Sequence, residues 1–258
     1  MQIELYDYEA AACAMKARWA LAEADLPWTR HWVDLCRFEQ KTADYLEIHP
    51  DGTVPAARFD GVLVLGADAI MSRVSEIAGE GRLSSAGRDV AEWLDRVSEI
   101  HQAYRPVIFT EVFMPMHRAR TAEDLDAVLS NFSSRSQREL AERLIQNGIP
   151  KERVATALER IARGFEEANE VLSAQTWLAG DRFSIADIGL FPYVNSPLHA
   201  VSEIWFEKMP GLTGWLERMR SRPAYVAAVE NYPYPDEFWS TVVRAPSGGG
   251  YRSPAAAA

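Results

Sequence analysis

The spacing of apolar residues changes at residues 79–87, a stretch rich in glycine and serine. Before it, short apolar runs of strand length alternate with turn residues. After it, apolar residues recur at the three- and four-residue intervals of an amphipathic helix, beginning with Val90, Trp93 and Leu94. We therefore expect an α/β domain over residues 1–80, a linker over 81–88, an all-helical domain over 89–240 and a disordered low-complexity tail over 241–258.

In the first domain, the sequence pattern predicts strands that alternate with helices. Its last two strands flank Asp60-Gly61, a dipeptide that favours tight hairpin turns. The expected order is β-α-β-α-β-β-α, with strands at 2–6, 28–33, 55–59 and 62–65 and helices at 10–24, 42–48 and 67–78.

Throughout the second domain the apolar residues have helical spacing, and we expect the helices to be interrupted at prolines. Ser184 followed by Asp187 has the form of a capping box, which predicts a helix start and a role in folding. The expected helices are 90–104, ended or kinked at Pro106; 125–144, interrupted at 133–136; 154–172; 184–200, interrupted at Pro192 and Pro197; and 212–230, split at Pro223.

Composition narrows the possible partners and compartment. The 258 residues carry a net charge of −10, which disfavours nucleic acid and anionic membranes as partners. The two cysteines, Cys13 and Cys36, form no CxxC motif or metal-ligand cluster, and so few cysteines favour a reducing compartment. The N-terminus does not resemble a signal peptide, and no apolar run is long enough to span a membrane. We expect a soluble cytoplasmic protein.

Three segments resemble members of the glutathione S-transferase superfamily. They are residues 49–56 (HPDGTVPA), residues 177–188 (WLAGDRFSIADI) and residues 210–229. The resemblance implies a thioredoxin-like α/β domain followed by an all-helical domain. It also implies a cis peptide bond before Pro55, which turns the Val54 backbone to pair with the cysteinyl part of glutathione.

Within this superfamily the chain resembles the bacterial β-etherases, which cleave lignin-derived β-aryl ethers. The similarity is carried by Val33-Asp34, Phe38-Glu39-Gln40, Val54-Pro55, the spacing from Leu5-Tyr6 through Lys16 to Ala20-Leu21, and a helical region around 121–150. It covers about residues 3–235. It implies that a glutathione thiolate attacks the β-carbon of an aryl ether and releases a phenol.

The sequence departs from this family pattern at two places. Ala14 stands where the subgroup has a serine that activates the glutathione thiol, and Cys13 precedes it. Gly66 and Ala67 replace an acid and a hydroxyl that hold the γ-glutamyl group, and Asp68 follows one position later. Each lost charged hydrogen bond is worth about 1.5–3 kcal/mol. Two losses would weaken glutathione binding by roughly two to four orders of magnitude.

The resemblance nevertheless indicates candidate site residues, each with a structural alternative. Cys13 is a candidate catalytic thiol or a small buried filler. The candidates for glutathione binding are Gln40, Lys41, Thr53, Val54, Pro55 and Asp68. The candidates for an aromatic acceptor pocket are Tyr104, Phe109, Phe113 and His117, which fit a helix core or a dimer interface equally well.

Three functions remain open from the sequence. The first is a glutathione-dependent enzyme that cleaves small aromatic ethers as one chain of a homodimer or heterodimer. The second is a non-catalytic partner subunit whose related chain binds glutathione. The third is a thiol transferase that uses Cys13, which requires an accessible thiol with a low pKa.

Overall fold

The computed structural model describes residues 1–79, 82–205 and 208–238. The expected tail over 241–258 lies outside the described residues, as do residues 80 and 81, where the expected first domain meets the expected linker. The α/β part ends with α3 (Ala67–Ala78), and the helical part begins with α4 (Arg88–Ile108).

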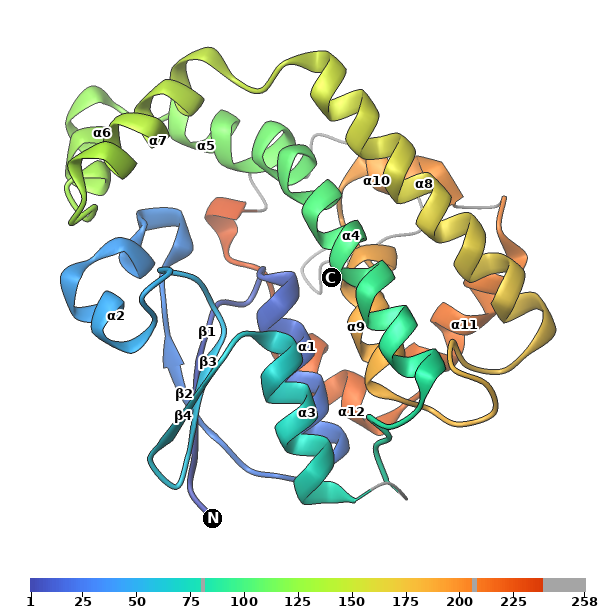
Figure 1. The fold of residues 1–258 in the computed structure, drawn as a ribbon. Helices are drawn as coiled ribbons and strands as arrows, with labels where there is room; N and C mark the ends of the chain where they lie inside the picture. The colour runs from blue at the N-terminus through green and yellow to red at the C-terminus, as the bar shows by residue number, and fades with distance from the viewer. Residues whose placement is uncertain (80–81, 206–207, 239–258) are drawn as a thin grey trace, which may run out of the picture.

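The N-terminal part is a four-stranded mixed sheet with the thioredoxin-like order β2-β1-β3-β4. Strand β2 is parallel to β1, whereas β3 is antiparallel to both β1 and β4. The elements are β1 (Ile3–Asp7), α1 (Ala12–Glu23), β2 (Thr29–Trp32), α2 (Ala43–Ile48), β3 (Ala56–Phe59), β4 (Val62–Leu65) and α3. This order confirms the predicted β-α-β-α-β-β-α pattern, and helices α1 and α3 lie side by side (Figure 1).

The hairpin between β3 and β4 turns at Asp60-Gly61, as predicted. Both residues have positive φ, 47° for Asp60 and 85° for Gly61. A two-residue turn of this kind has the twist that matches two antiparallel strands. The turn therefore fixes the register in which Ala56 faces Leu65 and Phe59 faces Val62.

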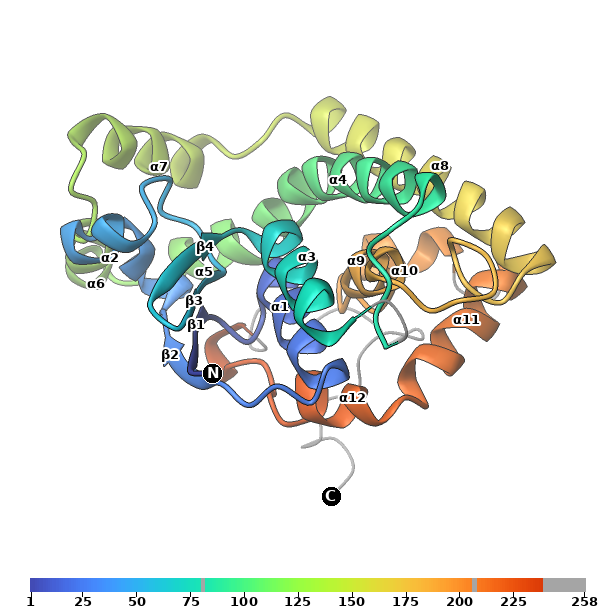
Figure 2. The same ribbon diagram turned by 60° about the horizontal axis from the view of Figure 1, so that its bottom comes forward.

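The remainder of the described chain is helical (Figures 1 and 2). Helix α9 (Ile185–Val194) is buried along its whole length, where it packs against α1 and α4 and so joins the two parts. None of the described helices is long and apolar enough to cross a membrane. The other elements after α4 are η3 (Phe109–Phe113), α5 (Met114–Arg118), α6 (Ala122–Leu129), α7 (Arg135–Asn147), α8 (Lys151–Ala174), α10 (His199–Trp205), α11 (Pro210–Arg220), α12 (Pro223–Tyr225) and η4 (Val226–Glu230).

Helix α4 does not end at Pro106, and the interruption predicted at Pro192 is wrong. Pro106 lies inside α4, which continues to Ile108 and then into the π-helical turn η3. Pro192 lies inside α9, which ends only at Val194. Both helices are held by buried faces, and such packing outweighs the hydrogen bond that an internal proline removes. The interruption expected at Pro197 is confirmed, because α10 begins at His199.

The capping box at the start of α9 is confirmed and fully buried. One Asp187 oxygen, Oδ1, accepts from the Leu178 backbone N–H and the Trp215 indole, both at 3.0 Å. The other, Oδ2, accepts from the Ser184 N–H at 3.0 Å. Burial outweighs these hydrogen bonds and raises the pKa of Asp187 to about 6. The motif therefore stabilises the helical core and does not belong to a binding site.

Candidate functional site

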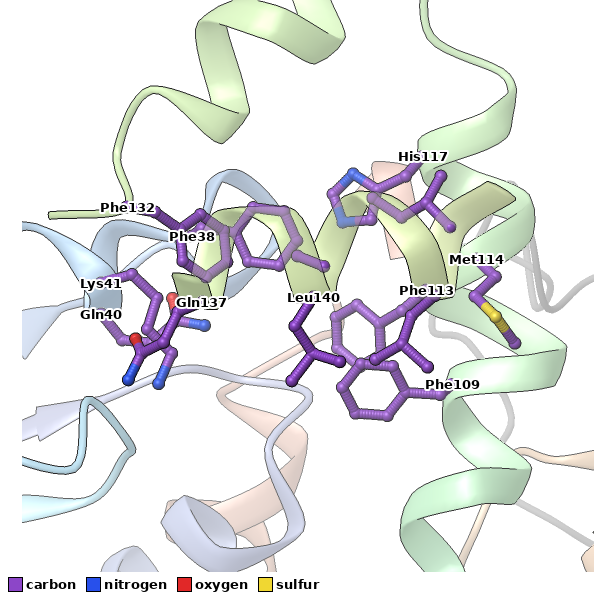
Figure 3. Close-up of a pocket in the computed structure, with 13 residues that line it drawn as sticks. Phe38, Gln40, Lys41, Phe109, Phe113, Met114, His117, Phe132, Gln137 and Leu140 are labelled. Atoms are coloured by element: carbon purple, nitrogen blue, oxygen red, sulfur yellow. The ribbon is translucent and has the colours of Figure 1, made fainter. Parts of the chain in front are cut away.

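A pocket of about 300 Å³ opens between the segment Phe38–Lys41 and the helical part of the chain (Figure 3). Five residues predicted from the sequence line it together: Gln40, Lys41, Phe109, Phe113 and His117. The remaining lining residues are Phe38, Met114, Phe132, Gln137, Leu140, Ala141, Leu144 and Ile145. A volume of this size, with mainly apolar walls and a few polar groups, suits a small organic ligand.

Phe38 forms one wall of the pocket because of its backbone conformation. It lies between two short 3-10 helices, η1 (Leu35–Arg37) and η2 (Glu39–Lys41), with φ 57°. Asp34 caps the first of them by accepting from the Arg37 N–H at 3.1 Å. The left-handed turn places the Phe38 ring parallel to His117, with ring centroids 4.6 Å apart.

Helix α7 and the segment before it close the pocket on another side. The Ser133 N–H donates to the Lys41 carbonyl at 3.1 Å, which fastens this segment to the α/β part. Phe132 then packs on Phe38, with ring centroids 4.8 Å apart. Leu140 and Leu144, four residues apart, present one face of α7 to the cavity.

The polar end of the pocket contacts the loop that resembles the glutathione-binding segment. Lys41 Nζ donates to the Asp51 carbonyl at 3.0 Å. Burial, together with the nearby charge of Arg105, lowers the pKa of Lys41. Gly52 permits this contact, since its φ is +57° and a Cβ there would lie 2.5 Å from the Gln40 carbonyl oxygen.

The peptide bond between Val54 and Pro55 is cis, as the resemblance implies. Among the described residues, neither the N–H nor the carbonyl of Val54 has a hydrogen-bond partner, so both are available to a ligand. Thr53 is engaged within the loop. Its carbonyl accepts from the Tyr45 hydroxyl at 2.8 Å, and its hydroxyl lies 3.1 Å from His49 Nε2. Of these predicted residues, Val54 offers the freer backbone.

The start of α3 adjoins the loop at Val54 and Pro55, since the Gly66 N–H donates to the Pro55 carbonyl at 3.0 Å. It lacks the side chains that the resemblance implies there. Gly66 precedes the helix with φ 84° and provides no side-chain cap. Asp68 is exposed in the first turn, and its charge adds to the burial that raises the pKa of the Cys13 thiol. The free backbone N–H groups of this turn still favour an anion.

Cys13 does not have the environment of an activated thiol. Its Sγ lies 3.8 Å from His101 Nδ1, which also shares a hydrogen bond of 3.0 Å with the Tyr193 hydroxyl. Burial raises the pKa of Cys13 and outweighs the opposing charges of Lys16 and Arg105. A raised pKa leaves little thiolate near neutral pH. The geometry therefore favours the packing interpretation of Cys13.

Tyr104 was predicted in the acceptor pocket, and the structure places it elsewhere. It is buried in the helical core, where its hydroxyl shares a 2.8 Å hydrogen bond with Ser196. Its ring meets Tyr193 edge-on, with centroids 5.3 Å apart. Tyr104 faces α9 from the buried side of α4, whereas Phe109 and Phe113 lie beyond, in the π-helical turn.

Sequence reasoning missed two arginines near the site. Arg105 is exposed one turn after His101, and its charge adds to the burial that lowers the pKa of His101 and of Lys41. Its four-residue spacing from His101 was a visible signal. Arg120 donates to His117 Nδ1 at 3.3 Å and to the Cys36 carbonyl at 3.2 Å. The contact with Cys36 joins segments 84 residues apart, which no local pattern indicates.

Models of two domains of one family match the chain. They are Glutathione S-transferase, N-terminal domain, over residues 11–77, and Glutathione S-transferase, C-terminal domain, over residues 106–223. The chain belongs to the glutathione S-transferase superfamily, a family that binds glutathione and commonly forms dimers.

Individual relatives include a β-etherase. Protein LigF of Sphingobium sp. (strain NBRC 103272 / SYK-6) is 26% identical over 242 residues, which cover 87% of this chain and 91% of LigF. Glutathione S-transferase GstA of Escherichia coli O157:H7 is 24% identical over 224 residues, covering 84% of this chain and 92% of GstA. The predicted superfamily and the similarity to a β-etherase are confirmed.

Solved structures agree with the fold. The crystal structure of β-etherase LigF from Sphingobium sp. strain SYK-6 has a TM-score of 0.76 at 23% identity, covering 90% of this chain and all of that one. Glutathione transferase URE2P8 from Phanerochaete chrysosporium, solved with oxidized glutathione, has a TM-score of 0.65 at 19% identity, covering 90% and 95%. At these identities the structures establish the architecture.

Proposed function

We propose that this chain is a glutathione-dependent transferase that cleaves aromatic β-aryl ethers as one subunit of a homodimer or heterodimer. The observation that supports this most directly is that Lys41 contacts both the aromatic pocket and the glutathione-type loop. This residue lines the aromatic pocket and also donates to the loop that carries Val54 and cis-Pro55. An aryl group in the pocket would thus lie beside a glutathione thiol held by the Val54 backbone.

The reaction is displacement at carbon. The glutathione thiolate forms an S–C bond to the ether β-carbon, the C–O bond breaks, and the leaving phenolate takes up a proton from water. The pocket contributes by fixing the aryl ring among Phe38, Phe109 and Phe113, so that the ether carbon is presented to the sulfur. Lys41 and Arg105 place positive charge where a glutathione carboxylate and the thiolate are stabilised.

The glutathione site of this chain is weaker than the family pattern. The residues that fit are Val54, with its free backbone, and the cationic Lys41 with Gln40 beside it. The start of α3 fits less well, because Gly66 and Ala67 provide neither a carboxylate nor a hydroxyl. This deficit supports a second candidate function, in which the chain is the structural subunit of a heterodimer. We propose the cytoplasm as its location, since both cysteines are free thiols.

The test combines glutathione binding with product release. The purified chain is titrated with glutathione by calorimetry and assayed with 2-phenoxyacetophenone, whose β-carbon carries the phenoxy group. We expect weak binding, release of phenol and formation of the matching thioether. Lys41→Met should weaken glutathione binding by about 10- to 100-fold through loss of a charged hydrogen bond. Lys151→Met, at the exposed start of α8, is the matched control.

Light scattering of the same sample gives the oligomeric state. A dimer that releases phenol supports the enzyme. A chain that binds no glutathione and releases no phenol refutes autonomous catalysis and favours the partner-subunit function. Equal loss of glutathione affinity in the Lys41 and Lys151 variants would refute the placement of glutathione beside Lys41.

A further inference from the structure

One polar side chain in the aromatic pocket has a nitrogen without a partner. His117 is 1% exposed and lines the cavity. Its Nδ1 accepts a hydrogen bond from Arg120 Nε at 3.3 Å. In the described part of the chain, its buried Nε2 meets no hydrogen-bonding partner. Buried polar atoms in folded proteins are nearly always paired, so an unpaired one at a pocket wall points to a ligand.

Arg120 fixes which nitrogen carries the proton. Its guanidinium is largely buried and forms ion pairs with Asp124 and Glu237. A guanidinium can only donate, so His117 Nδ1 must be the acceptor and Nε2 must bear the hydrogen. Burial, followed by the charge of Arg120, lowers the pKa of His117 to about 4. Near neutral pH the ring is therefore a neutral Nε2–H donor.

The orientation of the ring is also fixed. Phe38 stacks on His117 with an angle of 15° between the ring planes. In Figure 3, Gln40 and Lys41 lie at one end of the pocket, whereas His117 lies with Phe113 and Met114 at the other. The pocket thus has a cationic end beside the glutathione-type loop and a single neutral donor at the opposite, apolar end.

We propose that His117 determines acceptor specificity by donating from Nε2–H to an oxygen on the aryl ring of the substrate. The inference rests on the proposed function and narrows its substrate class to β-aryl ethers whose ring carries a further oxygen substituent, such as a methoxy group. A hydrocarbon arene of the same shape leaves the donor unsatisfied and binds more weakly. The same contact orients the substrate, with the ring oxygen toward His117 and the reacting carbon toward Lys41.

The test compares two ligands of nearly equal shape. Anisole carries an oxygen acceptor, and ethylbenzene has a methylene group in its place. Their dissociation constants are measured by ligand-observed NMR on the full chain. An unsatisfied buried donor predicts that wild-type protein binds anisole about 5- to 100-fold more tightly than ethylbenzene. His117→Phe retains an aromatic ring against Phe38 and should reduce this ratio to about one.

Phe113→Leu is the matched control, because it changes the pocket wall without changing a polar group. It should weaken both ligands by a similar factor and preserve their ratio. Equal wild-type affinities for the two ligands would overturn the role of His117. Absence of binding by either ligand would overturn the assignment of the pocket to an aryl group.

A second measurement uses wild-type protein alone. Nitrogen-15 spectra of labelled histidine distinguish the two neutral tautomers, and His117→Phe identifies the His117 signals among the five histidines. We expect Nε2–H at neutral pH, and the Nδ1–H tautomer or a doubly protonated ring would overturn the inference. A retained anisole preference without phenol release from 2-phenoxyacetophenone would refute the proposed function and leave this inference standing. Phenol release with equal affinities for anisole and ethylbenzene would support the proposed function and overturn the role of His117.

Discussion

Replacing Ala67 by serine should strengthen glutathione binding. Ala67 is the first residue of α3, directly after Gly66, which provides no side-chain cap. The free N–H groups of this turn already favour a carboxylate, and a hydroxyl at position 67 adds one donor to it. Ala67→Ser therefore restores one of the two polar groups that this chain lacks at the start of α3.

The magnitude follows from one hydrogen bond to a charged group. Such a bond is worth about 1.5–3 kcal/mol, and ordering the hydroxyl and losing the alanine's helix propensity offset up to about 1 kcal/mol of it. The net gain of about 1–2 kcal/mol corresponds to roughly 5- to 30-fold tighter binding. Gly66→Glu is a poorer choice, because Gly66 has φ 84° and a side chain there is strained.

Calorimetric titration of glutathione into both variants and the wild type measures the effect. Ala69→Ser is the matched control, because it adds the same hydroxyl at an exposed position in the same helical turn. It should change the dissociation constant less than twofold. An unchanged constant for Ala67→Ser, or an equal gain in the control, would refute the placement of the γ-glutamyl carboxylate at the start of α3.

Three further predictions concern stability and reactivity. Because burial raises the pKa of Asp187 to about 6, protonation of its carboxyl favours the folded state, and this protonation-linked stability is full below pH 4 and lost as pH rises through 6. Urea unfolding should show the stability advantage of wild type over Asp187→Asn shrinking by about 2 kcal/mol between pH 4.5 and 7. A constant difference would contradict this. Because burial raises the pKa of Cys13, iodoacetamide should alkylate it at neutral pH at least tenfold more slowly than free cysteine. Mass spectrometry follows the reaction, and fast labelling would instead support the thiol-transferase hypothesis. Gly52→Ala should lower the free energy of unfolding by about 1–2 kcal/mol or more, since φ is +57° and the Gln40 carbonyl is in the way, whereas an unchanged urea midpoint would show that the loop shifts freely.

The parts of the fold that depend on local chemistry could be predicted from sequence. The hairpin at Asp60-Gly61 and the capping box from Ser184 to Asp187 both depend on residues within four positions of each other. The interruption at Pro192 was predicted wrongly, and α4 continues past Pro106, because both helices are stabilised by packing against distant elements, which a local rule does not see.

At the candidate site, too, the residues that follow from local sequence were predicted and those that depend on distant contacts were not. Phe109, Phe113 and His117 were predicted as one cluster because they lie within nine residues and share apolar neighbours. Phe132 and Leu140 were not predicted, since the helices around 121–150 are polar overall and only the tertiary fold brings their few apolar residues to the pocket. The role of Arg120 also required the structure, because its partners come from four separate segments.

The π-helical turn at Phe109–Phe113 has a consequence for how this pocket changes during evolution. Such a turn holds one residue more than a turn of α-helix. Deleting one residue from it would restore an unbroken helix and leave the residues that follow, including His117, facing nearly the same way relative to α4. A single-codon deletion at this point would therefore reshape the pocket wall at Phe109–Phe113 while the polar group that faces the cavity, His117, stays in place. Descendants of this chain can diverge in ligand preference through changes in length as well as through substitutions.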